Sequence, residues 1–111
     1  MFDKDGGHLE VMAEALERID IYLRGFDESS FAADQRTVDA VALNLLVTGE
    51  ASIHLSKALK AQVALPWGEM AGLRHHIAHG YFGLSPVRLW RTASSDAPVL
   101  RSQVATWLER R

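Results

Sequence analysis

Residues 8–24, HLEVMAEALERIDIYLR, repeat apolar side chains every three or four positions. The apolar positions are Leu9, Met12, Ala13, Leu16, Ile19 and Leu23, with charged side chains between them. This spacing predicts an amphipathic helix over about 8–24 with one face in a core. Gly25 is expected to end the helix. The pair Gly6-Gly7 predicts that its start is late or frayed.

A second stripe of the same period follows a polar connector, residues 26–37, FDESSFAADQRT. It consists of Val38, Val41, Ala42, Leu45, Ser52, Leu55 and Leu59, and predicts a helix over about 34–60. Phe31 is expected to anchor the connector to the core. A glycine inside a helix costs about 1 kcal/mol relative to alanine, so Gly49 predicts a close approach of another helix.

The rest of the chain also has helical spacing. Residues 61–66, AQVALP, interrupt it, and a third helix is predicted from Trp67 to about His79, with Gly80 as its stop. Its inward side chains are expected to be Trp67, Met70, Ala71 and Ile77. Ser85-Pro86 suits the start of a last helical segment. Pro98 should kink or split that segment, and Val99, Val104, Trp107 and Leu108 should pack its final part.

These patterns predict one domain, residues 1–111, folded as an all-α, up-and-down bundle of four or five helices. The 111 residues suit one domain, and 48% are hydrophobic. The absence of cysteine, of a signal peptide and of a long apolar run favours a cytoplasmic protein with no membrane association.

The charge is unevenly distributed along the chain. The net charge is −2, but residues 1–56 carry four basic and eleven acidic side chains, whereas residues 57–111 carry eight basic and three acidic ones. A basic groove could bind a phosphate backbone, although oppositely charged helices packed together explain the pattern more simply.

The segment of residues 74–81, RHHIAHGY, concentrates three histidines, an arginine and a tyrosine. One interpretation is a ribonuclease site. RNA carries its own nucleophile, the 2′-hydroxyl, so cleavage needs a base, an acid and positive charge at the phosphate, without a metal. Histidine suits the proton transfers, and arginine grips phosphate oxygens.

Arg74 and His79 are five residues apart, which places them about 140° apart around an ideal helix. They converge only if the helix ends near His79, as Gly80 suggests, or if Arg74 bends across. A two-fold dimer could also bring a second arginine and histidine to the same cleft.

Two other interpretations stay open. His75 and His79, at i and i+4, and His76 and His79, at i and i+3, have spacings that bind metals, but no HExxH glutamate or third ligand is evident. A structural role is the other alternative, because histidines near a helix C-terminus favour its dipole and Tyr81 could be a half-buried core residue.

Residues 74–83, RHHIAHGYFG, resemble the signature of HepT proteins in the HEPN class: arginine, four residues, histidine, one residue, tyrosine. Arg74, His79 and Tyr81 match it, and the segments LERIDIYLRGFDESSFAADQRTVDAVALNLLVTGEA and PWGEMAGLRHHIAHGYFGL are similar to the family's first three helices.

The resemblance implies a helical bundle that dimerises around this motif. It implies a metal-independent endoribonuclease without cofactor, acting on RNA as the toxin of a type VII-like toxin–antitoxin pair. The partner would be a minimal nucleotidyltransferase antitoxin that transfers AMP to Tyr81 and silences the toxin. The alternative is a non-catalytic, substrate- or partner-binding subunit of a two-component nucleotidyltransferase.

The resemblance also assigns roles. Arg74 would hold the scissile phosphate, His79 would be the general acid or base, and Tyr81 the modification site. We expect His75 to support the pair, and Glu50 to face the motif and bind Arg74 or a histidine. Four basic side chains could form a phosphate-binding rim, although each one taken alone is more simply explained as a solvated surface charge: Lys57, Lys60, Arg88 and Arg91. His76 is left without a role.

Overall fold

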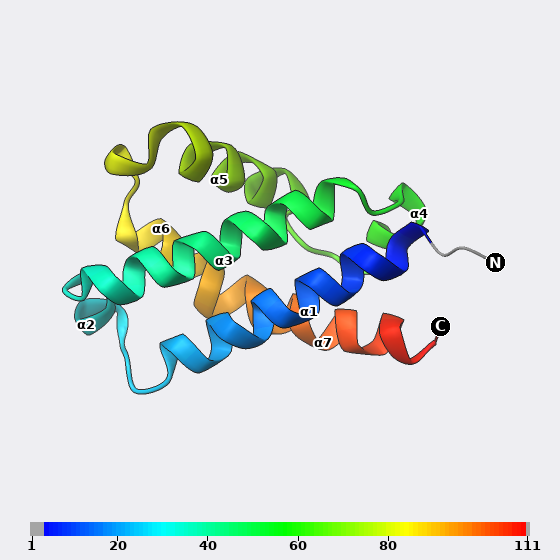
Figure 1. Cartoon of the computed structure of the whole chain (residues 1–111), viewed down its shortest axis with the longest axis horizontal. Helices are drawn as coiled ribbons and strands as arrows, with labels where there is room; N and C mark the ends of the chain where they lie inside the picture. Colours follow the sequence, from blue (N-terminus) through cyan, green and yellow to red (C-terminus); the bar gives the residue numbers. More distant parts are fainter. Residues whose placement is uncertain (1–3, 111) are drawn as a thin grey trace.

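Four long helices dominate the computed structural model of the chain, which describes residues 4–110 (Figure 1). They are α1 (Lys4–Leu23), α3 (Gln35–Ile53), α5 (Trp67–Gly80) and α7 (Ala97–Glu109). Short helices α2 (Glu28–Ala32), α4 (Lys57–Lys60) and α6 (Pro86–Arg91) join them, with a 3₁₀ turn η1 (Tyr81–Gly83) and a π-helical turn η2 (Thr92–Asp96). No strand occurs in the described residues, so the all-α prediction is confirmed. Met1–Asp3 and Arg111, which the predicted domain includes, lie outside them.

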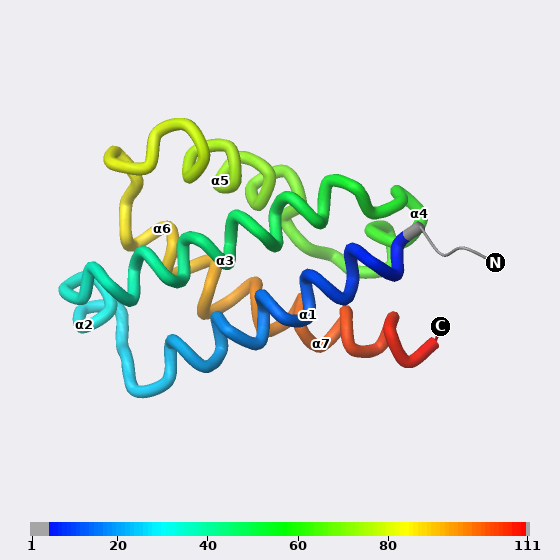
Figure 2. The backbone as a smooth tube through the Cα atoms, viewed as in Figure 1, coloured from blue at the N-terminus to red at the C-terminus, as the bar shows by residue number. Residues whose placement is uncertain are grey.

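The long helices alternate in direction, as an up-and-down bundle requires (Figure 2). Helix α3 packs against α1 on one side and α5 on the other, and α7 packs against α1. Side chains from all these elements form one core, in which Leu16, Phe31, Val41, Leu100 and Val104 are almost fully buried. Phe31 therefore anchors the connector as predicted. No described helix combines the length and the hydrophobicity needed to cross a membrane.

Helix α1 begins earlier than its sequence predicts. Gly6 and Gly7 lie inside the helix, and Gly6 is buried, so the expected late start is wrong. Tertiary packing overrides the weak helix propensity of glycine here. The Asp5 carboxylate also accepts a hydrogen bond of 3.1 Å from the backbone N–H of Ser56, the N-cap residue of α4, which ties the first turn of α1 to the start of α4. Gly25 follows the helix with φ 84°, the left-handed conformation expected of a terminating glycine.

The predicted helix over 34–60 is divided in two. Helix α3 ends at Ile53, and a new turn, α4, starts after Ser56, whose hydroxyl accepts a hydrogen bond of 3.1 Å from the Leu59 N–H. Serine competes with the helix by bonding the backbone locally, which makes it a good N-cap and a poor interior residue. The apolar stripe continues across this break, and for that reason the sequence pattern did not reveal it.

The last two long helices follow the predictions with two corrections. In α5, Met70 and Ile77 are buried as expected, Leu73 also faces the core, and Trp67 is partly buried against it, whereas Ala71 is only partly buried and lies outside this core. The final helical segment is split as predicted, because η2 precedes Pro98 at the second position of α7.

The inward assignment of Val99 is wrong, because its side chain is 49% exposed. Leu100, four residues before Val104, lies on the buried face of α7. Val99 is five residues before Val104 and so points elsewhere.

Candidate active site

Arg74 lies in the middle of α5 and is held by a carboxylate from α3. Its Nε donates a hydrogen bond of 2.6 Å to Glu50 Oε1, and its Nη2 forms an ion pair with the same oxygen. The Arg74 side chain is 27% exposed and that of Glu50 47%. The expected contact between Glu50 and the motif is therefore present, and it fixes the guanidinium at the rim of the interface between α3 and α5.

Gly49 allows α5 to approach α3 at this point. A Cβ added to Gly49 would lie 2.7 Å from Arg74 Cβ and 3.1 Å from Arg74 Cγ, closer than side chains tolerate. Only a glycine fits there without a shift of the helices. The close helix approach predicted from Gly49 is confirmed, and its neighbour on the other helix is Arg74.

The three histidines of the motif separate into a pair and a single residue. The His75 and His79 rings lie 4.6 Å apart between centroids along the exposed face of α5. His76 instead lies toward α6, where its Nδ1 is 3.1 Å from Arg88 Nη1. Among residues 4–110, no three histidine, aspartate or glutamate side chains gather closely enough to hold a metal ion. The metal interpretation thus still lacks a third ligand in the described part of the chain.

Tyr81 stands in η1, directly after α5, and its hydroxyl donates a hydrogen bond to Asp39 Oδ1 near the start of α3. Gln35 Nε2 donates to the same oxygen over 2.7 Å. Partial burial, and then the hydrogen bond and charge of Asp39, raise the pKa of Tyr81 to about 12. The hydrogen bonds from Tyr81 and Gln35 lower the pKa of Asp39. Tyr81 is thus a protonated phenol held by a carboxylate.

Asp39 did not emerge from the sequence. It precedes Tyr81 by 42 residues, and a single aspartate near a helix start has no signal that separates it from a solvated surface charge. The only indication was indirect: a half-buried tyrosine usually finds a hydrogen-bond partner for its hydroxyl.

Arg74 and Tyr81 are tied to α3 at two well-separated points. Glu50 and Asp39 are eleven positions apart on that helix, which corresponds to roughly 16 Å of rise. Arg74 and His79 also have different neighbours, since Arg74 contacts α3 and His79 contacts His75. Because α5 continues through Gly80, the two side chains stay on different faces of the helix, so a single chain does not bring them together.

Two surface hollows of about 360 Å³ each adjoin the turn that carries Tyr81. One is lined by α3, η1 and α6 and includes Gln35, Asp39, Tyr81 and Pro86; the other is formed by residues 77–83. Phe82, which lines both, is fully exposed.

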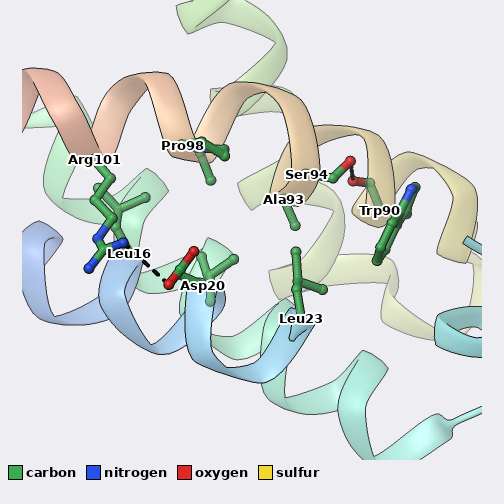
Figure 3. A pocket seen from close by; sticks show the side chains of 10 residues that line it. Leu16, Asp20, Leu23, Trp90, Ala93, Ser94, Pro98 and Arg101 are labelled. Carbon is green, nitrogen blue, oxygen red and sulfur yellow. Dashed lines mark hydrogen bonds and ion pairs between the residues drawn. The ribbon is translucent and has the colours of Figure 1, made fainter. Parts of the chain in front are cut away.

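A third hollow, of about 260 Å³, lies between α1 and the segment α6–α7 (Figure 3). Its wall is mostly apolar, and an ion pair of 3.3 Å joins Asp20 and Arg101 at its edge. None of the site residues predicted from the sequence lines it.

The family model and the similar proteins all point to the same family. Residues 12–106 match the family described as Ribonuclease HepT-like. A probable ribonuclease HepT of Thermococcus cleftensis is 36% identical over 97 residues, which are 86% of this chain and 88% of that protein. A protein of Methanocaldococcus jannaschii, named as a candidate RNase, is 30% identical over 84 residues, 75% of this chain and 77% of its own. One of Caldanaerobacter subterraneus, named likewise, is 29% identical over 104 residues, 93% of either chain.

No solved structure matches the chain significantly. The family match covers all of α3 and α5, α1 from Met12 onward and α7 up to Thr106, and it includes Glu50 and the whole motif. The chain therefore belongs to the ribonuclease HepT-like family.

Proposed function

We propose that this chain is a metal-independent endoribonuclease and the toxin of a toxin–antitoxin pair. The observation that carries the proposal is the placement of Arg74, which packs against Gly49, is held by Glu50, and shares α5 with the exposed histidines His75 and His79. Phosphodiester cleavage requires a fixed cation and solvent-accessible proton carriers, and one chain supplies both on the same helix, although on different faces. Membership of the HepT-like family supports the same activity.

In the proposed reaction the 2′-oxygen attacks the adjacent phosphorus and the bond from phosphorus to the 5′-oxygen breaks. The products are a 2′,3′-cyclic phosphate and a 5′-hydroxyl. His79 takes the proton from the 2′-hydroxyl or gives one to the leaving oxygen, and Arg74 neutralises the non-bridging oxygens. Since Nε and Nη2 of Arg74 face Glu50, Nη1 is the donor offered to the phosphate.

Glu50 and His75 are positioning residues in this proposal. Glu50 fixes the plane of the guanidinium, which otherwise has many rotamers. His75 lies against the His79 ring and limits its rotation. Neither needs to touch the reacting atoms.

We further propose that the active form is a homodimer. Arg74 and His79 diverge on α5, and a two-fold axis would place an arginine of one chain near a histidine of the other. Exposed apolar side chains close to the motif support an interface there: Ile53, one turn beyond Glu50, is 46% exposed, and Phe82 is fully exposed.

The proposed antitoxin is a minimal nucleotidyltransferase that modifies Tyr81. In this step the Tyr81 oxygen bonds to the α-phosphorus of ATP, pyrophosphate leaves, and the phenolic proton is released. The surface position of the Tyr81 hydroxyl beside an open hollow supports access by such an enzyme. The added phosphate would lie next to the Asp39 carboxylate, and like charges repel, so modification would release η1 from α3.

The test is cleavage of RNA by the purified chain in EDTA, with unmodified Tyr81 verified by mass spectrometry. We expect 2′,3′-cyclic phosphate ends, and a loss of about 10²–10³-fold in rate for Arg74→Ala or His79→Ala, with helicity unchanged by circular dichroism. Intact RNA at high protein concentration, or full activity of either variant, would contradict the proposal and favour a non-catalytic binding subunit.

The same variants test the composite site. We expect that mixing inactive Arg74→Ala and His79→Ala chains, after unfolding and refolding together, restores part of the activity, because a mixed dimer supplies one intact arginine and one intact histidine. Mixed dimers that form but stay inactive would show that each chain needs its own pair.

A further inference from the structure

His76 is the one histidine of the motif segment that the proposed reaction does not use. Its ring contacts Arg88 on α6, with 3.1 Å between His76 Nδ1 and Arg88 Nη1. This contact links α5 to α6 across the turn at residues 81–85, and both side chains are exposed.

The chemistry of this contact determines which group donates. Arginine can only donate hydrogen bonds, so Nδ1 of His76 is the acceptor in this contact. Arg88 also differs from Arg24, Arg74 and Arg101, each of which pairs with a carboxylate. Arg88 forms no ion pair with any carboxylate that the structure describes. A partner without negative charge orients the guanidinium without neutralising its charge, and so leaves it able to bind an anion.

The position of the pair relates it to the candidate active site. His76 precedes His79 by three residues, so the two lie on neighbouring faces of the same helix turn. The His76 ring also lies near the end of α5, since a Cβ added to Gly80 would be 3.5 Å from His76 Cδ2. Helix α6 begins just after the turn that carries Tyr81 (Figure 1). Arg88 is thus a cation held beside His76, which precedes His79 by three residues on the same helix.

We propose that His76 and Arg88 form a phosphate subsite, which binds an RNA backbone phosphate next to the one that is cleaved. Arg88 makes the contact, and His76 is the residue that positions it. The subsite rests on the proposed ribonuclease function and deepens it, because it would fix how the strand continues beyond Arg74 and His79. Phosphate contacts of this kind position a strand without reading its sequence.

The first test is binding of a single-stranded RNA in the His79→Ala background, where cleavage cannot interfere. We expect Arg88→Ala to weaken binding about tenfold, and to reduce the slope of log affinity against log salt by about 0.7, the value for one phosphate contact. In the cleaving chain, KM should rise while kcat stays within about twofold. The matched control is Arg110→Ala, an exposed arginine at the end of the chain, which should leave binding nearly unchanged.

The second test isolates the positioning role of His76. We expect His76→Ala to weaken binding about three- to fivefold, but to have no effect in a chain that already carries Arg88→Ala. His76→Asn should retain binding, because its amide oxygen can replace Nδ1 as a neutral acceptor. Equal effects of His76→Ala in both backgrounds, or no rescue by asparagine, would overturn the positioning role.

The outcomes separate this subsite from the ribonuclease proposal. If the wild-type chain cleaves RNA and Arg88→Ala changes neither KM nor the salt slope, the subsite is wrong and the ribonuclease stands. If the chain binds RNA through Arg88 but never cleaves it, the phosphate contact of Arg88 stands, while the proposed reaction and the place of the subsite beside a scissile phosphate are wrong.

Discussion

The two ends of α3 hold their partners in opposite ways. Near its C-terminal end, Glu50 forms a hydrogen bond and an ion pair with Arg74. At the neighbouring Gly49, α5 lies so close to α3 that a residue with a side chain would not fit. Near its N-terminal end, Asp39 accepts one hydrogen bond from Tyr81 in a short exposed turn, with Gln35 on the same oxygen. The first contact lies at a packed helix interface, and the second at the surface.

This difference agrees with the different roles proposed for Arg74 and Tyr81. A residue that stabilises a transition state gains from rigid placement, because its charge must already be in position when the reaction occurs. A residue that is to be modified must be reached by another enzyme and must be able to leave its partner.

The largest effect is expected from Gly49→Ala. The new Cβ would lie 2.7 Å from Arg74 Cβ, which cannot move without shifting α5. Overpacking of this kind costs about 1–3 kcal/mol, more than the gain of about 1 kcal/mol in helix propensity. Urea denaturation should therefore show a lower free energy of unfolding, and RNA cleavage should fall because Arg74 is displaced.

Gly72→Ala is the matched control for that change. Gly72 also lies inside a long helix, but nothing lies within 4 Å of a Cβ added to it. The same substitution should stabilise the chain by up to about 1 kcal/mol through propensity alone. If both variants change stability in the same direction, the interface at Gly49 is not as tight as the geometry indicates.

A smaller effect is expected from Glu50→Gln. Glutamine keeps the size of the side chain and can accept one hydrogen bond from Arg74, but it lacks the charge. The partly exposed ion pair contributes at most about 1 kcal/mol to stability, so the melting temperature should change little. Cleavage should fall about tenfold in kcat, because the guanidinium is less firmly oriented. Unchanged kcat would show that Glu50 does not position Arg74 for the reaction.

The comparison also shows which features a sequence can reveal. The stripes of apolar residues predicted the long helices, and a mid-helix glycine predicted the close approach at residue 49, because both depend on regular spacing along one element. The break at Ser56, the bond from Asp39 to Tyr81 and the contact of His76 with Arg88 were not predicted. Each depends on the three-dimensional placement of two segments, and no local pattern distinguishes these side chains from ordinary polar ones.

The smallest expected effect is at the surface end and concerns the phenol of Tyr81. Its raised pKa, about 12 against an ordinary 10.0, means that the folded chain holds this proton more tightly than the unfolded chain. The stability from this bond is thus complete below pH 10 and is lost as the pH rises through the folded pKa. Asp39→Asn removes a negative charge beside the hydroxyl and should lower the pKa of Tyr81 toward 10, although not fully, because partial burial is its first cause.

Alkaline titration of phenolate absorbance can measure this shift in a Tyr22→Phe background, which leaves Tyr81 as the only tyrosine. Gln35→Ala supplies a control of opposite sign, since the hydrogen bonds of Gln35 act to lower the pKa of Tyr81. We expect Asp39→Asn to lower the midpoint and Gln35→Ala to leave it unchanged or raise it. If neither substitution changes the titration midpoint, Tyr81 is not hydrogen-bonded to Asp39 in solution. The contrast between the two ends of α3 would then rest on the Arg74 contact alone.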